Sequence, residues 1–164
     1  MAVVSLGACK SRNRTRVQTD EEPPRMAAVL SMADPRANAQ LVNGFYPVEQ
    51  NAWRWTASKF SVILRTPRSA DQKGATLKLK LTVPDSVIQQ VKSTGVSATL
   101  NGVDLAPESY TQSGEYIYTR DVPARAFAGD SVKIDFALQK FIPPGPVDAR
   151  ELGIVVSMVG LEGK

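Results

Sequence analysis

Strict alternation of apolar and polar residues over residues 75–83 is the feature that most limits what this chain can fold into. Leu77, Leu79 and Leu81 fall on one side of an extended chain, and lysines and threonines fall on the other. Successive side chains of a strand point to opposite faces, so the pattern predicts a strand with one buried and one wet face. Residues 131–138 repeat it. Such half-buried strands are typical of antiparallel sheets.

Shorter strand-like segments surround these two. Apolar and β-branched residues fill 59–66, 96–100, 103–105, 115–122 and 154–161. Asn101-Gly102 between two of them is a strong hairpin signal. No long helical period is present, although residues 86–92 could form a short helical turn. The sequence therefore predicts an all-β fold, an antiparallel β-sandwich.

The chain of 164 residues divides into three parts by composition. Residues 41–164 hold all the strand signals and form the expected sandwich domain. Residues 10–40 have no sustained period and contain Pro23-Pro24 and Asp34-Pro35, which predicts a flexible tether. Residues 1–9 are expected to be a truncated lipoprotein signal that ends at a cysteine.

That cysteine, Cys9, is the only one in the chain, and it follows Leu6-Gly7-Ala8. The four residues resemble a bacterial lipobox, in which the cysteine becomes the lipidated first residue. The prediction is lipidation at Cys9 and a membrane-anchored location in a bacterial cell envelope, on the periplasmic or surface side. The apolar run before it is shorter than a complete signal peptide. The alternative is an N-terminus that carries no signal, and then a cytoplasmic protein.

Several function classes are excluded by residue content. The chain has no histidine and one cysteine. A Ser-His-Asp triad, a Cys-His dyad and a zinc site are therefore not expected. The net charge of +4 is spread along the chain without a basic stripe, so no nucleic-acid partner is expected. We expect no enzyme activity, no cofactor and no bound metal.

Aromatic residues supply the ligand-binding candidates. Trp53 and Trp55 are two apart, so on a strand both rings share a face, either as core residues or as a platform for a sugar ring. The core interpretation is favoured. The tyrosines with polar neighbours are expected to be reachable from solvent and are the candidate ligand-binding residues: Tyr110, Tyr116 and Tyr118.

Charged and aromatic residues gather in two motifs at either end of the predicted domain. We expect them to fasten its first strand to its last loop through arginine–carboxylate pairs, and we call them the clasp: Glu49, Trp53, Arg54, Trp55, Asp148 and Arg150. A remote alternative uses two of the carboxylates as the catalytic pair of a hydrolase.

The same motifs carry a family resemblance. The segments are Gly44-Phe45-Tyr46-Pro47-Val48-Glu49, Trp53-Arg54-Trp55-Thr56, Asn101-Gly102 and Asp148-Ala149-Arg150-Glu151-Leu152-Gly153-Ile154. Over residues 41–162 the chain resembles a bacterial β-sandwich module found attached to glycosyltransferases and in envelope lipoproteins. The resemblance implies a jelly-roll-like, carbohydrate-binding-module-like domain with no catalytic residues. It suggests a glycan as ligand, and the alternative is a protein–protein interaction or assembly module of the envelope.

Overall fold

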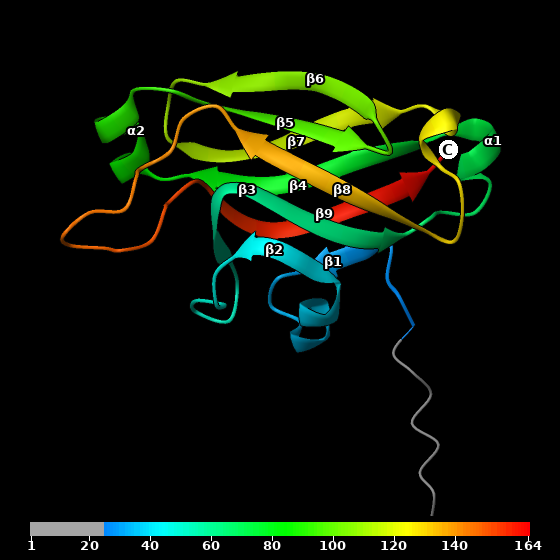
Figure 1. Cartoon of the computed structure of the whole chain (residues 1–164), viewed down its shortest axis with the longest axis horizontal. Coiled ribbons are helices and arrows are strands. Elements are labelled where there is room, and N and C mark those ends of the chain that lie inside the picture. The colour runs from blue at the N-terminus through cyan, green and yellow to red at the C-terminus, as the bar shows by residue number, and fades with distance from the viewer. Residues whose placement is uncertain (1–24) are drawn as a thin grey trace, which may run out of the picture.

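The computed structural model describes residues 25–164 (Figure 1). The predictions made for residues 1–24, lipidation of Cys9 among them, lie outside this part. The strands are β1 (Val29–Ser31), β2 (Leu41–Phe45), β3 (Arg54–Arg65), β4 (Ala75–Val83), β5 (Thr94–Leu100), β6 (Val103–Tyr110), β7 (Gly114–Val122), β8 (Ser131–Leu138) and β9 (Val155–Gly163). The helical elements are short: η1 (Pro35–Gln40), α1 (Ala70–Lys73), α2 (Asp85–Val91) and η2 (Ala124–Ala126).

The strands form two antiparallel sheets that share β3. One sheet contains β1, β9, β4 and β7, and the other contains β2, β3, β8, β5 and β6. Arg54 and Trp55 at the start of β3 pair with β9, whereas residues from Lys59 onward pair with β8. The predicted all-β antiparallel sandwich with a jelly-roll-like architecture is confirmed (Figure 1).

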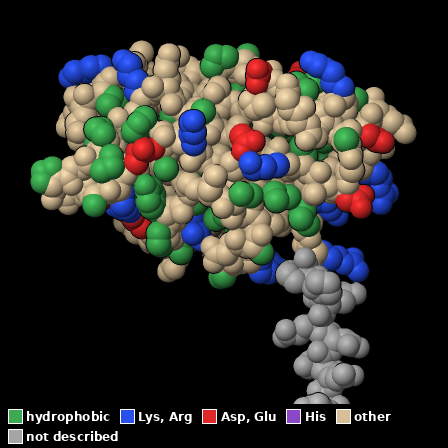
Figure 2. Space-filling view, viewed as in Figure 1, with side chains coloured by type: hydrophobic (Ala, Val, Ile, Leu, Met, Phe, Trp, Pro, Cys, Tyr) green, Lys and Arg blue, Asp and Glu red, His purple; other side chains and the backbone are tan. Residues whose placement is uncertain are grey.

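The core lies between the sheets and is built by the predicted alternation. Leu77 and Leu79 of β4 are fully buried, and so is Phe60 of β3. The Phe60 ring stacks on Phe136 of β8, with centroids 4.9 Å apart. Outer faces carry side chains of both charges without a single-sign patch on the face shown in Figure 2. One example is the ion pair of 2.9 Å between Lys133 Nζ and Asp135 Oδ1 on β8.

The strand path ends at β6 and β7, which side chains rather than a backbone ladder hold together. Arg120 Nε and the Tyr118 hydroxyl of β7 donate to the Ala106 carbonyl of β6, at 2.7 and 2.8 Å. Arg120 Nη2 donates to the Pro107 carbonyl at 2.9 Å. These donors occupy part of an edge that would otherwise be free to pair with another chain.

The domain begins earlier than the expected boundary at residue 41. β1 pairs with β9, and η1 packs beneath it, so residues 29–40 belong to the folded domain instead of the tether. The physical reason is burial: Leu30, Met32 and Ala37 are at most 4% exposed. Their short apolar run is too brief to show a period of its own. Within residues 25–164, no helix has the length and apolar character to cross a membrane.

Candidate functional site

Two of the candidate tyrosines, Tyr118 of β7 and Tyr110 at the end of β6, are buried, which corrects the expectation that solvent reaches them. Tyr118 is 0% exposed and Tyr110 is 5% exposed. Tyr116 of β7 is half-buried, its ring lies against that of Tyr110 with centroids 4.4 Å apart and a tilt of 40°, and its hydroxyl donates to the Gln112 carbonyl. The shared face predicted for Tyr116 and Tyr118 turns toward the core, and Ile117 takes the exposed side at 55%.

Burial changes the acidity of two of these phenols. It raises the pKa of Tyr110 to about 12, and nearby Glu108 adds to the effect. It also raises the pKa of Tyr118. The Tyr110 hydroxyl is buried without a hydrogen-bond partner. A neutral, inaccessible phenol of this kind is a core residue and has no route to a ligand.

Arg150 is the centre of the charged part of the clasp. Its guanidinium makes a two-point contact with Asp148, with Nη2 2.9 Å from Oδ2 and Nε 3.1 Å from Oδ1. Nη1 lies 3.3 Å from Glu49 Oε1. The hydrogen bonds from Arg150 lower the pKa of Asp148, and those to Asp148 and Glu49 raise the pKa of Arg150. The structure thus brings together three of the four charged residues predicted for the clasp, namely Glu49, Asp148 and Arg150.

Arg54 does not join this lattice. It is 7% exposed, and its guanidinium donates to Asn38 Oδ1 at 2.6 Å and to the Tyr46 carbonyl at 3.1 Å. Burial lowers the pKa of Arg54. Its partners were not predicted, because Asn38 lies in the segment expected to be a tether. Arg54 instead ties η1 and the end of β2 to the start of β3.

Backbone contacts at the clasp join β3 to the loop before β9. The Gly153 amide donates to the Thr56 carbonyl at 2.7 Å, and the Thr56 amide donates to the Ile154 carbonyl at 2.9 Å. Glu151 Oε1 accepts from the Ser58 amide. A Cβ at Gly153 would lie 2.3 Å from Leu138 Cδ1 and 2.9 Å from the Ala57 carbonyl oxygen. The motif glycine is therefore required by close packing.

The aromatic residues of the clasp are all half-buried but differ in their packing against the core. Trp55 packs against the core and lies beside Val155 of β9. Trp53 is not packed against that core. Tyr46 pairs with Trp55 through its amide and lies under the Arg150 guanidinium, 5.3 Å from ring centroid to Cζ. The Tyr46 ring therefore lies against the charged network, and Trp53 is joined to the network by its backbone bridge to Glu49. Tyr46 is a member that the sequence analysis did not single out.

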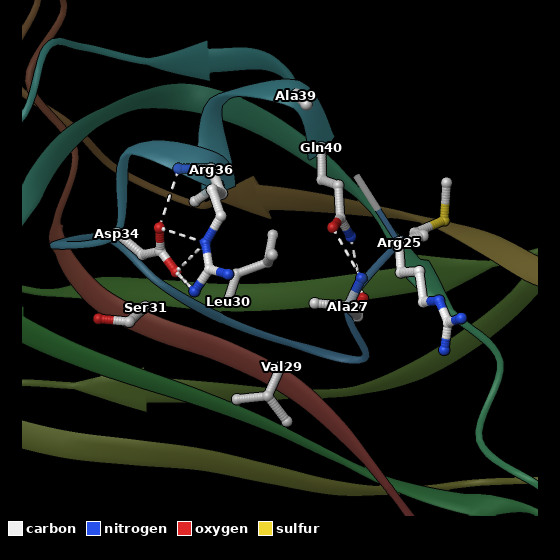
Figure 3. A pocket seen from close by; sticks show the side chains of 11 residues that line it. Arg25, Ala27, Val29, Leu30, Ser31, Asp34, Arg36, Ala39 and Gln40 are labelled. Carbon is white, nitrogen blue, oxygen red and sulfur yellow. Dashed lines mark hydrogen bonds and ion pairs between the residues drawn. The ribbon is translucent and has the colours of Figure 1, made fainter. Parts of the chain in front are cut away.

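A separate cavity of about 490 Å³ lies between β1 and η1 (Figure 3). The ion pair of Asp34 and Arg36 stands at one end, and the Gln40 amide bonded to Ala27 stands at the other. Sequence analysis did not predict it, because residues 10–40 show no period. Among residues 25–164, no group of three or more histidine, cysteine or acidic side chains could hold a metal ion.

Comparison with known proteins gives structural neighbours only. No protein-family model matches the chain, and no curated protein matches it in sequence. A family 35 carbohydrate-binding module from Clostridium thermocellum is 11% identical, with a TM-score of 0.46 over 82% of this chain and 98% of that one. The mannan-recognising module TmCBM27 is 12% identical, with a TM-score of 0.47 over 85% and 98%.

A third neighbour, a CBM4 module, is 12% identical, with a TM-score of 0.39 over 83% of this chain and 85% of that one. TM-scores below 0.5 at such low identity do not assign a ligand. The question of function therefore rests on the chain's own residues.

Proposed function

We propose that this protein is a non-catalytic binding module that recognises carbohydrate at the clasp, with Trp53 and Tyr46 as the ring platform. The observation that carries the proposal is the half-buried indole of Trp53, which is not packed against the core, while the Trp53 backbone forms a β-bridge with Glu49 of the Glu49–Arg150–Asp148 network. Binding sites combine apolar and aromatic surface with a few placed polar groups. The clasp offers both.

The chemistry of each group suits a sugar. The apolar CH face of a pyranose packs on an aromatic ring, and a ring with a polar edge also serves at wet sites. Adjacent hydroxyls can accept from a guanidinium fork and donate to a carboxylate. Glu49, Asp148 and Arg150 side chains are each about one-third to two-fifths exposed, at 41%, 34% and 37%. They are held in place and still accessible.

The geometry of the same groups argues against hydrolysis. A glycosidase needs two carboxyl groups on either side of an open space for the scissile bond, one of them with a raised pKa. Here the Arg150 guanidinium contacts both Glu49 and Asp148. The hydrogen bonds from Arg150 lower the pKa of Asp148, the opposite of what a general acid needs. A binding role is the better use of this arrangement.

Tryptophan fluorescence tests the proposal directly, because the chain's two tryptophans, Trp53 and Trp55, both belong to the clasp. Titration of the full chain with a panel of soluble cell-wall and plant oligosaccharides should change the emission. Trp55→Phe leaves Trp53 as the only reporter and should retain the change. Trp53→Ala should abolish binding measured by calorimetry, whereas Tyr116→Phe should not. Binding that survives Trp53→Ala would move the site elsewhere.

We further propose that the module is anchored to a bacterial envelope membrane through lipidated Cys9. The support is the lipobox-like Leu6-Gly7-Ala8-Cys9 and the use of the chain's only cysteine there. Mass spectrometry of the protein from a membrane fraction should find a lipid on Cys9, and Cys9→Ser should release the protein. An unmodified terminus at Met1 or Ala2 would contradict the proposal.

A further inference from the structure

β1 has one bonded edge and one outward edge, as its register with β9 shows. The pairs are Val29 with Gly160, Leu30 with Val159 and Ser31 with Met158. The Ala28 carbonyl and the Met32 amide bond to β9. Bonded positions alternate along an antiparallel strand, so residues 28, 30 and 32 face β9. The backbone groups of Ala27, Val29 and Ser31 therefore point away from it.

Two of these three outward positions already have partners. The Ala27 amide donates to Gln40 Oε1 at 2.8 Å, and the Ala27 carbonyl accepts from Gln40 Nε2 at 2.9 Å and from the Arg65 amide of β3 at 3.0 Å. The Ser31 carbonyl accepts from the Asp34 amide at 3.1 Å. Between them, the outward N–H and C=O of Val29 have no hydrogen-bond partner among residues 25–164. A single backbone donor–acceptor pair is left open.

This open pair borders the cavity between β1 and η1 described above. Val29 lines the cavity, and the Gln40 contact shows that the outward edge faces η1 (Figure 3). The small side chains of Ala37 and Ala39 line the cavity from η1. Its volume of about 490 Å³ is within the range of ligand sites, roughly 300–1,000 Å³. The space is sufficient for a few extended residues.

We propose that this groove binds a short extended peptide of a partner protein, which forms one β-bridge with Val29. Addition of a strand to an exposed sheet edge is an established mode of peptide recognition. One peptide residue supplies both an N–H and a C=O in the spacing that Val29 offers. The side-chain amide of Gln40 makes the same paired contact at Ala27, two residues away. The bound segment is thus a peptide, and this site is separate from the clasp.

The ends of the groove define the length and composition of the peptide. Gln40 closes one end, and the turn at Asp34 closes the other, so only one residue can pair with β1. Ala37 and Ala39 leave room for a small apolar side chain at that residue.

Nuclear magnetic resonance of the full ¹⁵N-labelled chain tests the proposal. The probes are acetylated and amidated pentapeptides with serine at both ends and glycine, alanine, valine or leucine in the centre. At least one should shift the Val29 and Ser31 amides and slow exchange of the Val29 amide hydrogen. N-methylation of the central residue removes its donor and should weaken binding about tenfold.

Matched variants locate the site. Val29→Pro removes the outward N–H without touching a bond to β9, and should weaken binding at least about tenfold relative to Val29→Ala. Ala39→Phe fills the groove and should abolish binding, whereas Val42→Phe, at another exposed position, should not. Failure of every peptide at millimolar concentration, or binding unaffected by both Val29→Pro and Ala39→Phe, would overturn the proposal. A Val29 amide protected from exchange before peptide is added would also overturn it, because another segment would then hold the edge.

Discussion

The side-chain amide of Gln40 pairs with the backbone of Ala27 as a neighbouring strand would, giving one hydrogen bond to the amide and one to the carbonyl. Its Nε2 also donates to the Ile63 carbonyl of β3 at 2.7 Å. Gln40 is 8% exposed. One buried side chain thus links the entry to β1 with β3, and through β1 with β9. It adds to the backbone hydrogen bond of 3.0 Å that the Arg65 amide of β3 donates to the Ala27 carbonyl.

Gln40→Ala should therefore destabilise the domain by about 1–3 kcal/mol, because the Ala27 amide and the Ile63 carbonyl lose their partner in a buried place. β1 should be the first strand to open. Hydrogen exchange would show this as faster exchange at the Leu30 and Met32 amides, whereas β4 amides stay protected. Gln90→Ala, on the exposed side of α2, is the control. It should change neither the stability of the domain nor the exchange of the β1 amides.

Gly153→Ala should lower the free energy of unfolding by about 1–3 kcal/mol, because the added methyl group would overlap Leu138 and the backbone of Ala57. Gly145→Ala, in the same loop, is the matched control because no atom lies within 4 Å of its Cβ position. Urea denaturation of both variants checks the difference. Equal midpoints would show that the loop relaxes around the methyl group and that the clasp tolerates it.

The two buried tyrosines should respond in opposite directions to loss of the hydroxyl. Tyr118→Phe removes a hydrogen bond and leaves the Ala106 carbonyl with one donor fewer, so a loss of about 0.5–1.5 kcal/mol is expected. Tyr110→Phe removes a buried hydroxyl that has no partner, so stability should stay the same or rise. The midpoints of thermal unfolding of the Tyr118→Phe and Tyr110→Phe variants, compared with that of the parent protein, check both expectations. A large loss for Tyr110→Phe would mean that the hydroxyl has a partner, such as an ordered water.

Stability should fall as the pH rises above 10. The folded pKa of Tyr110 is about 12, whereas a phenol in the unfolded chain has a pKa near 10. Between these values the unfolded state loses the proton first, so ionisation favours unfolding, and the stability present below pH 10 declines toward pH 12. Urea midpoints at pH 9, 10 and 11 measure the decline. Tyr110→Phe should decline less over that interval.

The alternation in residues 75–83 and 131–138 was sufficient to predict the sandwich, because a half-buried strand imposes its period on the sequence. Tyr116 and Tyr118 show the limit of that signal. Their common face was predicted, but which face is buried depends on the neighbouring strands, and Ile117 takes the wet side. The polar neighbours of these tyrosines in the sequence suggested that the tyrosines face solvent. A tyrosine can nevertheless be buried when its hydroxyl donates to a carbonyl, as Tyr118 does to Ala106.

Residues 29–40 and Arg54 show a second limit. β1 has three residues, too few for a visible period, and its stability comes from β9 and Gln40, which are distant in sequence. Arg54 was expected to meet a carboxylate, because arginine pairs with acids more readily than with amides. It meets Asn38 and a carbonyl instead. A partner in a segment without regular pattern cannot be inferred from spacing.

Arg54→Ala should be among the most damaging single changes at the clasp. The guanidinium is buried and ties Asn38 of η1 to the Tyr46 carbonyl, so its removal leaves two acceptors and a cavity, a loss of about 2–4 kcal/mol. Arg54→Lys keeps the charge but cannot reach both acceptors. Its stability should therefore lie between that of the parent protein and that of Arg54→Ala. Arg65→Ala, at an exposed position on the same strand, is the control. If Arg54→Ala unfolds at the same urea concentration as the parent, the buried guanidinium contributes nothing to the fold, and its place beside Tyr46 would instead indicate a role in the binding site.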